Sequence, residues 1–258
     1  MFNPSKKITK KDIQELYYIT DIENVPSILD KGILSHNTVK DIPHVDISNK
    51  EIQGLRENKL VPLNTTGNKL PLWSFVCLFA QPHNAMMYVS RHKHICVIRL
   101  DKNILEQDDV IITDRNASCQ NATFAKASDW VLTNETARCL YSRQSLPTMT
   151  NQITHHDYKS IRQLEILCPQ KVAQKYILGF FVKQKEHMEK VLKMVTNKLL
   201  SLSVIINDNI FFLGKTTKLK TFMPLTFNAI NDDIKDNQPV TEESEDCTIV
   251  DEIITLSL

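Results

Sequence analysis

The sequence predicts a mixed α+β fold, and three observations support this prediction. Helical and extended segments follow one another without the regular strand–helix alternation that builds a parallel sheet. The chain has 258 residues, which is enough to bury a full hydrophobic core in one domain. Only five glycines are present, and their positions exclude both a GxGxxG turn and a phosphate-binding P-loop. If the protein binds a dinucleotide, it does so without a Rossmann turn.

The N-terminal segment predicts a strand followed by a short helix. Residues 16–19 are apolar and aromatic, which is typical of a strand. The helix is expected to begin near Val25-Pro26, where Asn24 can cap its first turn, and to end at Gly32.

A second helix is expected over about residues 49–58, because Ser48 and Glu51 have the spacing of a capping box. Arg56 then lies near the C-terminal end of that helix. Residues 114–151 are too polar and too long for a simple connection, which indicates a functional loop. The other expected strands and helices cover residues 75–80, 85–89, 95–100, 110–112, 161–168, 177–182, 185–202 and 204–212. Among these, the strand over 95–100 alternates apolar and charged residues and is expected to expose one face.

Charge is distributed unevenly along the chain. The whole sequence carries a net charge of +1, but residues 230–258 contain nine acidic residues and one basic residue, Lys235. The remaining 229 residues therefore carry about +9. A basic body is typical of a nucleic-acid-binding protein, whereas the acidic end alone is equally explained as solvated and disordered. We expect one catalytic domain over residues 1–213 and an acidic, flexible tail over residues 214–258.

The cysteines and the hydropathy pattern point to a cytoplasmic protein. No apolar run is long enough to span a bilayer, and Met1–Lys11 lacks the apolar stretch of a signal peptide. The six cysteines form no CxxC pair and no disulfide framework, which favours a reducing compartment. They are Cys77, Cys96, Cys119, Cys139, Cys168 and Cys247.

Glu165 stands out because of its surroundings. It lies in Leu164–Cys168, a segment that otherwise has the composition of a buried strand. Burying a carboxylate costs several kcal/mol unless the group has a partner, so Glu165 is either salt-bridged or functional. Arg162 can provide a structural partner, and the structural and catalytic interpretations are equally compatible with these residues.

A metal site is the main alternative. His92, His94 and Cys96 alternate along one expected strand and therefore share a face. No second ligand pair with zinc-like spacing lies nearby, and the adjacent His155 and His156 point to opposite faces, so no metal is expected. The aromatic residues that can either stack on a nucleic-acid base or fill the core are Trp73, Phe75 and Trp130.

Five short motifs lie along the chain at Tyr17–His36, Ile47–Arg56, Pro82–Tyr88, Thr113–Ala117 and Arg162–Pro169. In the same order, they resemble segments of the DarT family of DNA ADP-ribosyltransferases. Tyr17–His36 resembles the opening strand and helix of that family, and Ile47–Arg56 resembles its NAD-binding helix, which ends in an essential arginine. Pro82–Tyr88 is similar to its Arg-Asn-Pro-Met-Leu-Tyr segment, and Thr113–Ala117 to its Thr-Asp-x-Asn-Ala turn. Arg162–Pro169 resembles the strand that carries its catalytic glutamate. Each motif alone is weak, but the five together are specific.

The resemblance implies an ADP-ribosyltransferase-like fold with a split β-sheet core and peripheral helices. It implies that Glu165 is the catalytic carboxylate and Arg56 the catalytic arginine. Residues 41–58 would form the NAD-binding element, and residues 121–165 the substrate-reading loop. The implied NAD-binding positions are Tyr17, Tyr18, Ile19, Pro26, Leu34 and Arg56. The implied substrate-binding positions are His83, Asn84, Met86 and Arg115.

The implied activity is transfer of ADP-ribose from NAD, a co-substrate, to a base of single-stranded DNA, with no metal. In the family such an enzyme is a toxin paired with a macrodomain antitoxin. Tyr18 stands where many thymine-modifying members have histidine, and His83 replaces an arginine, so guanine is favoured over thymine. The alternatives are an ADP-ribosyltransferase acting on RNA or protein, and a catalytically lapsed relative that binds NAD or nucleic acid. The presence of both Arg56 and Glu165 favours an enzyme.

Overall fold

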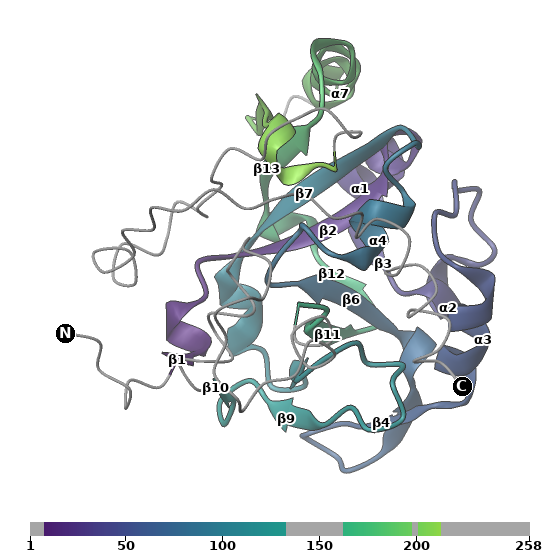
Figure 1. Cartoon of the computed structure of the whole chain (residues 1–258), viewed down its shortest axis with the longest axis vertical. Coiled ribbons are helices and arrows are strands. Elements are labelled where there is room, and N and C mark those ends of the chain that lie inside the picture. The colour runs from purple at the N-terminus through teal and green to yellow at the C-terminus, as the bar shows by residue number, and fades with distance from the viewer. Residues whose placement is uncertain (1–7, 133–161, 198–200, 213–258) are drawn as a thin grey trace, which may run out of the picture.

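The computed structural model describes residues 8–132, 162–197 and 201–212 (Figure 1). The expected tail over 214–258 and most of the expected substrate loop lie outside the described residues. The division into a domain over 1–213 and a tail therefore remains a prediction.

The described part of the chain folds around an eight-stranded mixed sheet with the strand order β14-β13-β7-β2-β6-β11-β8-β9. Neighbouring strands are antiparallel, except that β13 and β14 are parallel. In chain order the strands are β2 (Glu15–Asp21), β6 (Phe75–Phe79), β7 (Ile95–Asp101), β8 (Ile111–Thr113), β9 (Phe124–Lys126), β11 (Glu165–Pro169), β13 (Ile177–Val182) and β14 (Ser203–Ile206).

The sheet is divided into two halves that meet at a single point. β2 pairs with β7 from Glu15 to Asp21, and β6 pairs with β11 from Phe75 to Phe79. Between β2 and β6, however, the register contains only the pair Tyr17 and Phe79. This narrow connection confirms the expected split core, and the two strands separate on either side of it.

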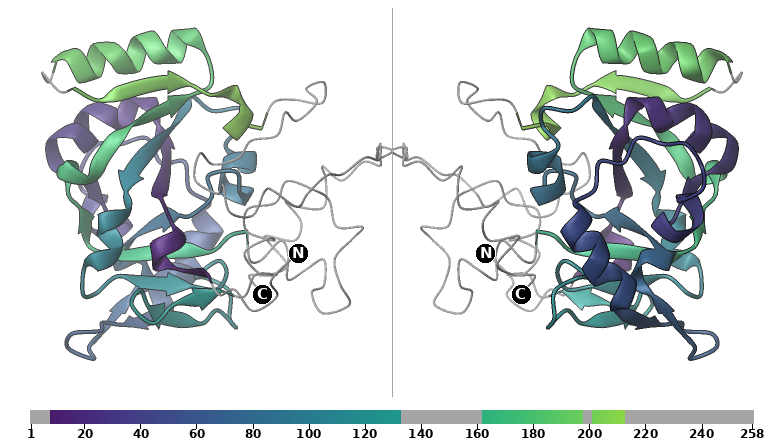
Figure 2. Two further views of the ribbon diagram at one scale, coloured as in Figure 1. Left: turned by 90° about the vertical axis from the view of Figure 1, so that its left-hand side faces the viewer. Right: turned by 90° about the vertical axis from the view of Figure 1, so that its right-hand side faces the viewer.

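Helices surround this core. The α-helices are α1 (Val25–Lys31), α2 (His36–Val39), α3 (Lys50–Asn58), α4 (Ala85–Val89) and α7 (Lys185–Asn197). The 3₁₀ turns are η1 (Lys10–Asp12), η2 (Ile22–Asn24), η3 (Leu72–Ser74), η4 (Lys102–Glu106), η5 (Gln174–Tyr176) and η6 (Asp208–Ile210). Figure 2 shows α7 at one end of the molecule beside β14, which it contacts together with β13 and α1.

Three short strand pairs complete the fold. β3 (Ile33–Leu34) pairs with β12 (Lys171–Val172), β4 (Leu60–Pro62) with β5 (Lys69–Pro71), and β1 (Ile8–Thr9) with β10 (Val131–Leu132). The β3–β12 pair ties the segment after α1 to the segment after β11.

The hydrophobic core lies on both faces of the sheet. The neighbouring residues Val97 and Ile98 of β7 are fully buried but belong to different clusters, because consecutive side chains of a strand point to opposite faces. The expectation that this strand exposes one face is therefore wrong. Its charged residue Arg99 is accommodated by Glu15 on β2, whose Oε2 accepts a hydrogen bond from Nε at 2.9 Å.

Two predicted helix caps differ in the structure. Asn24 does not cap α1: its side chain donates to Thr20 Oγ1 at 3.1 Å and accepts from Val45 N at 2.8 Å. It thereby ties the segment before α3 to β2. The cap of α3 is Asn49 rather than Ser48, since Asn49 Oδ1 accepts from Glu51 N at 2.9 Å.

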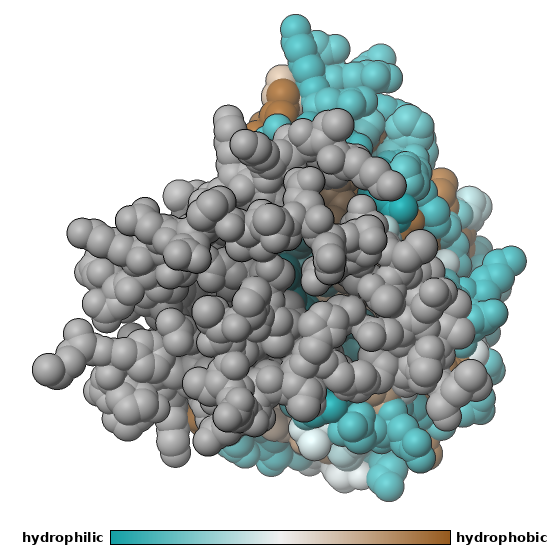
Figure 3. Space-filling model, in the orientation of Figure 1, coloured by the Kyte–Doolittle hydropathy of each residue, from teal (hydrophilic) through white to brown (hydrophobic). Residues whose placement is uncertain are grey.

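α7 does not bury all of its apolar side chains: Leu192 is 37% exposed, whereas the polar residue His187 is buried. In the orientation of Figure 1, the described surfaces around α7 and α3 are mainly hydrophilic (Figure 3). No helix in the described part of the chain is both long and apolar enough to cross a bilayer.

Gly32 precedes β3, and the pairing of β3 with β12 leaves no room for a side chain at this position. Its φ of +81° is a conformation that side chains disfavour, and a Cβ there would lie 2.3 Å from the Val172 carbonyl oxygen. We expect Gly32→Ala to lower the free energy of unfolding by about 2 kcal/mol or more, measured by chemical denaturation.

Gly54→Ala is the matched control for this measurement. Gly54 is exposed on α3, with no atom within 4 Å of an added Cβ. Alanine favours a helix over glycine, so this variant should be more stable than the wild type by roughly 0.5–1 kcal/mol. Equal effects of the two substitutions would contradict the steric explanation.

Candidate active site

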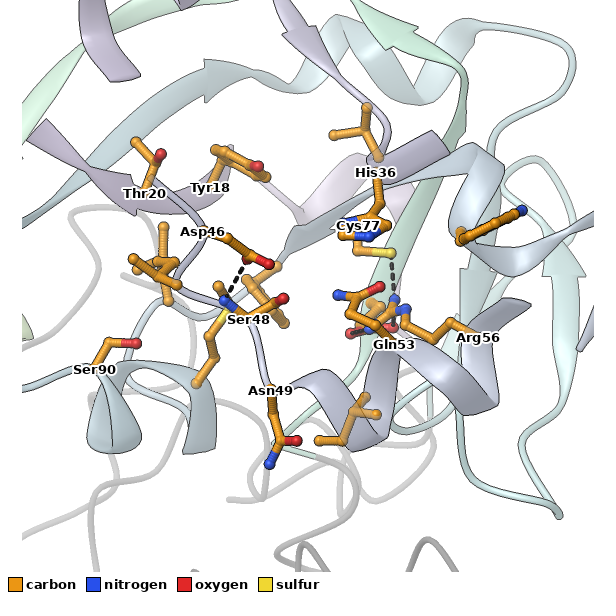
Figure 4. A pocket seen from close by; sticks show the side chains of 18 of the residues that line it. Tyr18, Thr20, His36, Asp46, Ser48, Asn49, Gln53, Arg56, Cys77 and Ser90 are labelled. Atoms are coloured by element: carbon orange, nitrogen blue, oxygen red, sulfur yellow. Dashed lines mark hydrogen bonds and ion pairs between the residues drawn. The ribbon is translucent and has the colours of Figure 1, made fainter. Parts of the chain in front are cut away.

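A pocket lies where β2 and β6 separate. Its walls come from these two strands, from the start of β11, and from α2, α3 and α4 (Figure 4). Tyr18 and Thr20 of β2 lie on one wall, and Cys77 of β6 and Arg56 of α3 lie together on another. The divided sheet thus leaves a cavity between two strands, each of which is paired with another strand on its far side.

Glu165 and Arg56 form a buried ion pair in this pocket. Arg56 Nη2 donates to Glu165 Oε2 at 3.0 Å, and Nη1 lies 3.4 Å from Oε1. Glu165 is 1% exposed and Arg56 8% exposed. Glu165 is the first residue of β11, and Arg56 lies in the last turn of α3. The predicted structural partner Arg162 instead contacts His83.

The turn that follows β8 also binds the Glu165 carboxylate. Ala117 N–H donates to Glu165 Oε2 at 3.1 Å. Thr113, fully buried at the end of β8, accepts a hydrogen bond from the Glu165 N–H at 2.9 Å through its hydroxyl oxygen. The β8–β11 register ends at Ile112 and Ile166, so a side-chain hydroxyl replaces the backbone ladder where Glu165 enters the site.

Cys77 lies on the other side of the Arg56 guanidinium, which donates to its sulfur. Burial raises the pKa of the Cys77 thiol to about 12, although Arg56 opposes this shift. Burial, with Cys77 and Asp46 adding to it, raises the pKa of Tyr18 to about 12. For Arg56 burial acts to lower the pKa, but Cys77 and Glu165 outweigh it, so its pKa is raised and the guanidinium stays charged.

Further polar groups face the pocket. Burial acts to raise the pKa of Asp46, but hydrogen bonds from Ser48 and the charges of His36 and His44 outweigh it, so this pKa is lowered. Ser48 N donates to Asp46 Oδ1 at 2.8 Å. Among the described residues, no side chain or backbone group is hydrogen-bonded to Gln53 Oε1 or Ser90 Oγ, which are both shielded from solvent. Such groups can bind a polar ligand.

The structure brings most of the expected NAD-binding positions together. The expected residues that line the pocket, besides Arg56 and Glu165, are Tyr18, Ile19, Leu34, Asn84 and Met86. Tyr17 and Pro26 are not among the lining residues. Tyr17 is 6% exposed and packs in the hydrophobic cluster that contains Ile19 and Phe79.

Of the expected substrate-binding residues, Asn84 and Met86 line the pocket, whereas His83 and Arg115 do not. Asn84 has a structural role as well, because it caps α4 by accepting from Met87 N at 3.1 Å. His83 lies outside the pocket lining, where its ring stacks on Phe212 with centroids 3.8 Å apart. Arg115 is also outside the lining and pairs with Asp114 at 3.1 Å.

Three residues at the site, Thr113, Ala117 and Cys77, are not apparent as individual site residues from the sequence. Thr113 and Ala117 lie in the Thr-Asp-x-Asn-Ala motif, which was the available signal, but their hydrogen bonds to Glu165 depend on the fold. Cys77 gave no signal, because an isolated cysteine in an apolar strand has the pattern of a core residue.

The suggested metal ligands do not share one strand, because β7 begins at Ile95 and His92 and His94 precede it. Cys96 is fully buried in the core, and His94 Nδ1 lies 3.3 Å from His187 Nε2 on α7. No group of three or more His, Cys, Asp or Glu side chains in the described ranges is arranged to hold a metal ion. His155 and His156 lie outside these ranges.

Comparisons with known proteins identify the family of the chain. The family model for DarT, described as an ssDNA thymidine ADP-ribosyltransferase, matches residues 17–212. A DNA ADP-ribosyl transferase–DNA ADP-ribosyl glycohydrolase fusion protein of Thermosipho africanus is 30% identical over 216 residues, covering 78% of this chain and 50% of the relative. The chain thus spans about half the length of that relative.

Solved structures show the same fold. Thermosipho africanus DarTG in complex with ADP-ribose matches with a TM-score of 0.63 at 28% identity, covering 78% of this chain and 51% of that one. DarT of Thermus sp. 2.9 in complex with ADP-ribosylated ssDNA matches with a TM-score of 0.64 at 19% identity, covering 80% of this chain and 100% of that one. Together with the family match over most of the described residues, these findings establish that the chain belongs to the DarT family.

Proposed function

We propose that this protein transfers ADP-ribose from NAD to a thymine base of single-stranded DNA. The observation that carries this proposal is the Arg56–Glu165 pair, buried in a pocket between the two halves of the sheet. A carboxylate beside a bound sugar is the group that this chemistry needs, and membership of the DarT family supplies the substrate class.

The proposed reaction breaks the bond between the nicotinamide nitrogen and the ribose carbon. Nicotinamide leaves with the bonding electron pair, and positive charge develops on the ribose. Glu165 stabilises this charge as carboxylates do in glycoside hydrolysis. A thymine ring nitrogen then bonds to the same carbon, and its proton passes to the Glu165 carboxylate or to solvent. Arg56 keeps the carboxylate oriented and carries a fixed positive charge for a phosphate or carbonyl oxygen.

Thymine replaces the guanine expected from the sequence. The matching family is described for thymidine, and no comparison supports a guanine preference. One of the residues behind that expectation, His83, stacks on Phe212 outside the pocket lining, so its identity gives little information about the base. A single strand is the proposed substrate because a base must leave its stack to reach a buried carboxylate.

A macrodomain antitoxin that removes the modification is the proposed partner. The similar Thermosipho africanus protein joins a DNA ADP-ribosyl transferase to a DNA ADP-ribosyl glycohydrolase in one chain, and this chain spans about half of it. We therefore propose a DNA ADP-ribosyl glycohydrolase as that partner, and that the toxin acts in the cytoplasm, as its scattered cysteines suggest.

The activity can be tested with labelled NAD and separate thymine-only and guanine-containing DNA oligonucleotides, RNA and protein. Mass spectrometry of the products should show one ADP-ribose on thymidine. Glu165→Ala should lower the rate at least about 100-fold, since it removes the electrostatic stabilisation of the transition state. A product on guanine, RNA or protein would instead identify one of the alternative substrates.

Glu15→Ala is the matched control for Glu165→Ala. Glu15 also pairs with an arginine, Arg99, on the same sheet but is outside the pocket lining. The Glu15→Ala variant should keep near wild-type activity when it is assayed at a temperature well below its unfolding midpoint. Equal losses of activity in both variants would reject a specific role for Glu165.

The hydroxyl of Thr113 should be needed for turnover rather than for NAD binding. Thr113→Val keeps the shape but leaves the buried Glu165 N–H without its acceptor, which costs about 1–3 kcal/mol and moves the carboxylate. We expect kcat to fall about 10-fold or more with KM for NAD changed less than about 3-fold, and Thr113→Ser to restore kcat. Equal kcat values for the Val and Ser variants would contradict this role.

A further inference from the structure

Trp73 is an accessible aromatic residue in the wall of the pocket. Of the three aromatic residues that the sequence offered for base stacking, Phe75 is 3% exposed and Trp130 is 5% exposed, each within a hydrophobic cluster. Trp73 and Phe75 both line the pocket, but only Trp73 is partly exposed. The structure thus separates one candidate for stacking from two core residues.

Trp73 is held in place by the helices around it. It lies in η3, which contacts both α2 and α3. His36 of α2 also lines the pocket, and its ring centroid lies 6.2 Å from that of Trp73 at an interplanar angle of 32°. In the close stack of His83 on Phe212 the centroids are only 3.8 Å apart. His36 therefore does not cover the face of Trp73 in the same way.

The strand register separates the backbone of Trp73 from that of Glu165. Glu165 pairs with Phe79 at one end of β6, and Pro169 pairs with Phe75 at the other. These four steps along β6 correspond to roughly 13 Å. Trp73 precedes Phe75 in the chain, in the turn that leads into this far end. An extended dinucleotide can reach from one end to the other.

We propose that Trp73, flanked by His36, stacks on the adenine ring of NAD. The inference rests on the proposed function, in which the scissile ribose lies at Glu165 and the adenine lies at the opposite end of the same molecule. An indole offers a large flat face for a purine, and base–aromatic stacking is a common source of affinity. The DNA base that is modified does not suit this position, because it must reach the ribose carbon at the Glu165 end.

Tryptophan fluorescence tests this assignment without turnover. The chain has two tryptophans, and Trp130 is buried in the core. In the absence of DNA, titration with NAD, and separately with AMP, should quench fluorescence to saturation. Nicotinamide mononucleotide, which lacks the adenine, should bind without this quenching.

Two substitutions separate stacking from binding. Trp73→Phe should lose the quenching but keep the Kd for NAD within about 3-fold, because phenylalanine also stacks. Trp73→Ala should raise the Kd by roughly 10-fold in calorimetry. As a control, Trp130→Phe should keep the quenching, and circular dichroism should show that each variant is folded.

Several results would overturn the inference. These are quenching by nicotinamide mononucleotide but not by AMP, quenching only by a single-stranded oligonucleotide, or an unchanged Kd in Trp73→Ala. If NAD binds without quenching, the stacking assignment fails while the proposed function stands. If NAD does not bind at all, both fail. Adenine-dependent quenching in a protein that modifies no DNA would support the assignment and reject the proposed function.

Discussion

The buried ion pair between Arg56 and Glu165 connects three distant segments of the chain at one point. Arg56 comes from α3, Glu165 from β11, and the Ala117 N–H that binds the same carboxylate from the turn after β8. Moving two charges out of water is costly, and removing one partner of such a pair typically costs about 3–5 kcal/mol. Hydrogen bonds from Ala117 to the carboxylate and from the guanidinium to Cys77 offset part of this cost. An arrangement that is this costly and this well oriented is expected where charge must act on a substrate.

The division of the sheet explains why there is room for that substrate. β2 and β6 are neighbours that pair only at Tyr17 and Phe79, while each is paired along its length with a strand on its other side. Each half is thus held by its own backbone pairing, and α2, α3 and α4 line the space between the halves. Residues from both halves, such as Tyr18 and Cys77, face the same cavity. The pocket is therefore a consequence of the topology and does not depend on a glycine-rich loop.

Local sequence patterns predicted the helices and strands better than they predicted which residues are buried and which residues they contact. The apolar run around Glu165 and the position of Arg56 at the end of a helix were both readable from the sequence, but the two residues are 109 positions apart and only the fold brings them together. The family resemblance supplied that pairing. Because of the charged residue Arg99, one face of a central strand was predicted to be exposed. The sequence alone does not show that Glu15 neutralises the charge of Arg99. His83 likewise lay in a motif for substrate binding, yet Phe212 holds it outside the pocket lining.

The claim that this pair serves chemistry rather than stability can be tested by replacing both residues with apolar ones of similar volume. The measurement is the free energy of unfolding of the Arg56→Met/Glu165→Leu double variant, with DNA modification assayed on the same sample. We expect stability within about 3 kcal/mol of the wild type, because the desolvation cost of the two charges is removed while the buried Ala117 N–H loses its acceptor. Activity should be lost. A double variant that is several kcal/mol less stable, or that still modifies DNA, would contradict this explanation.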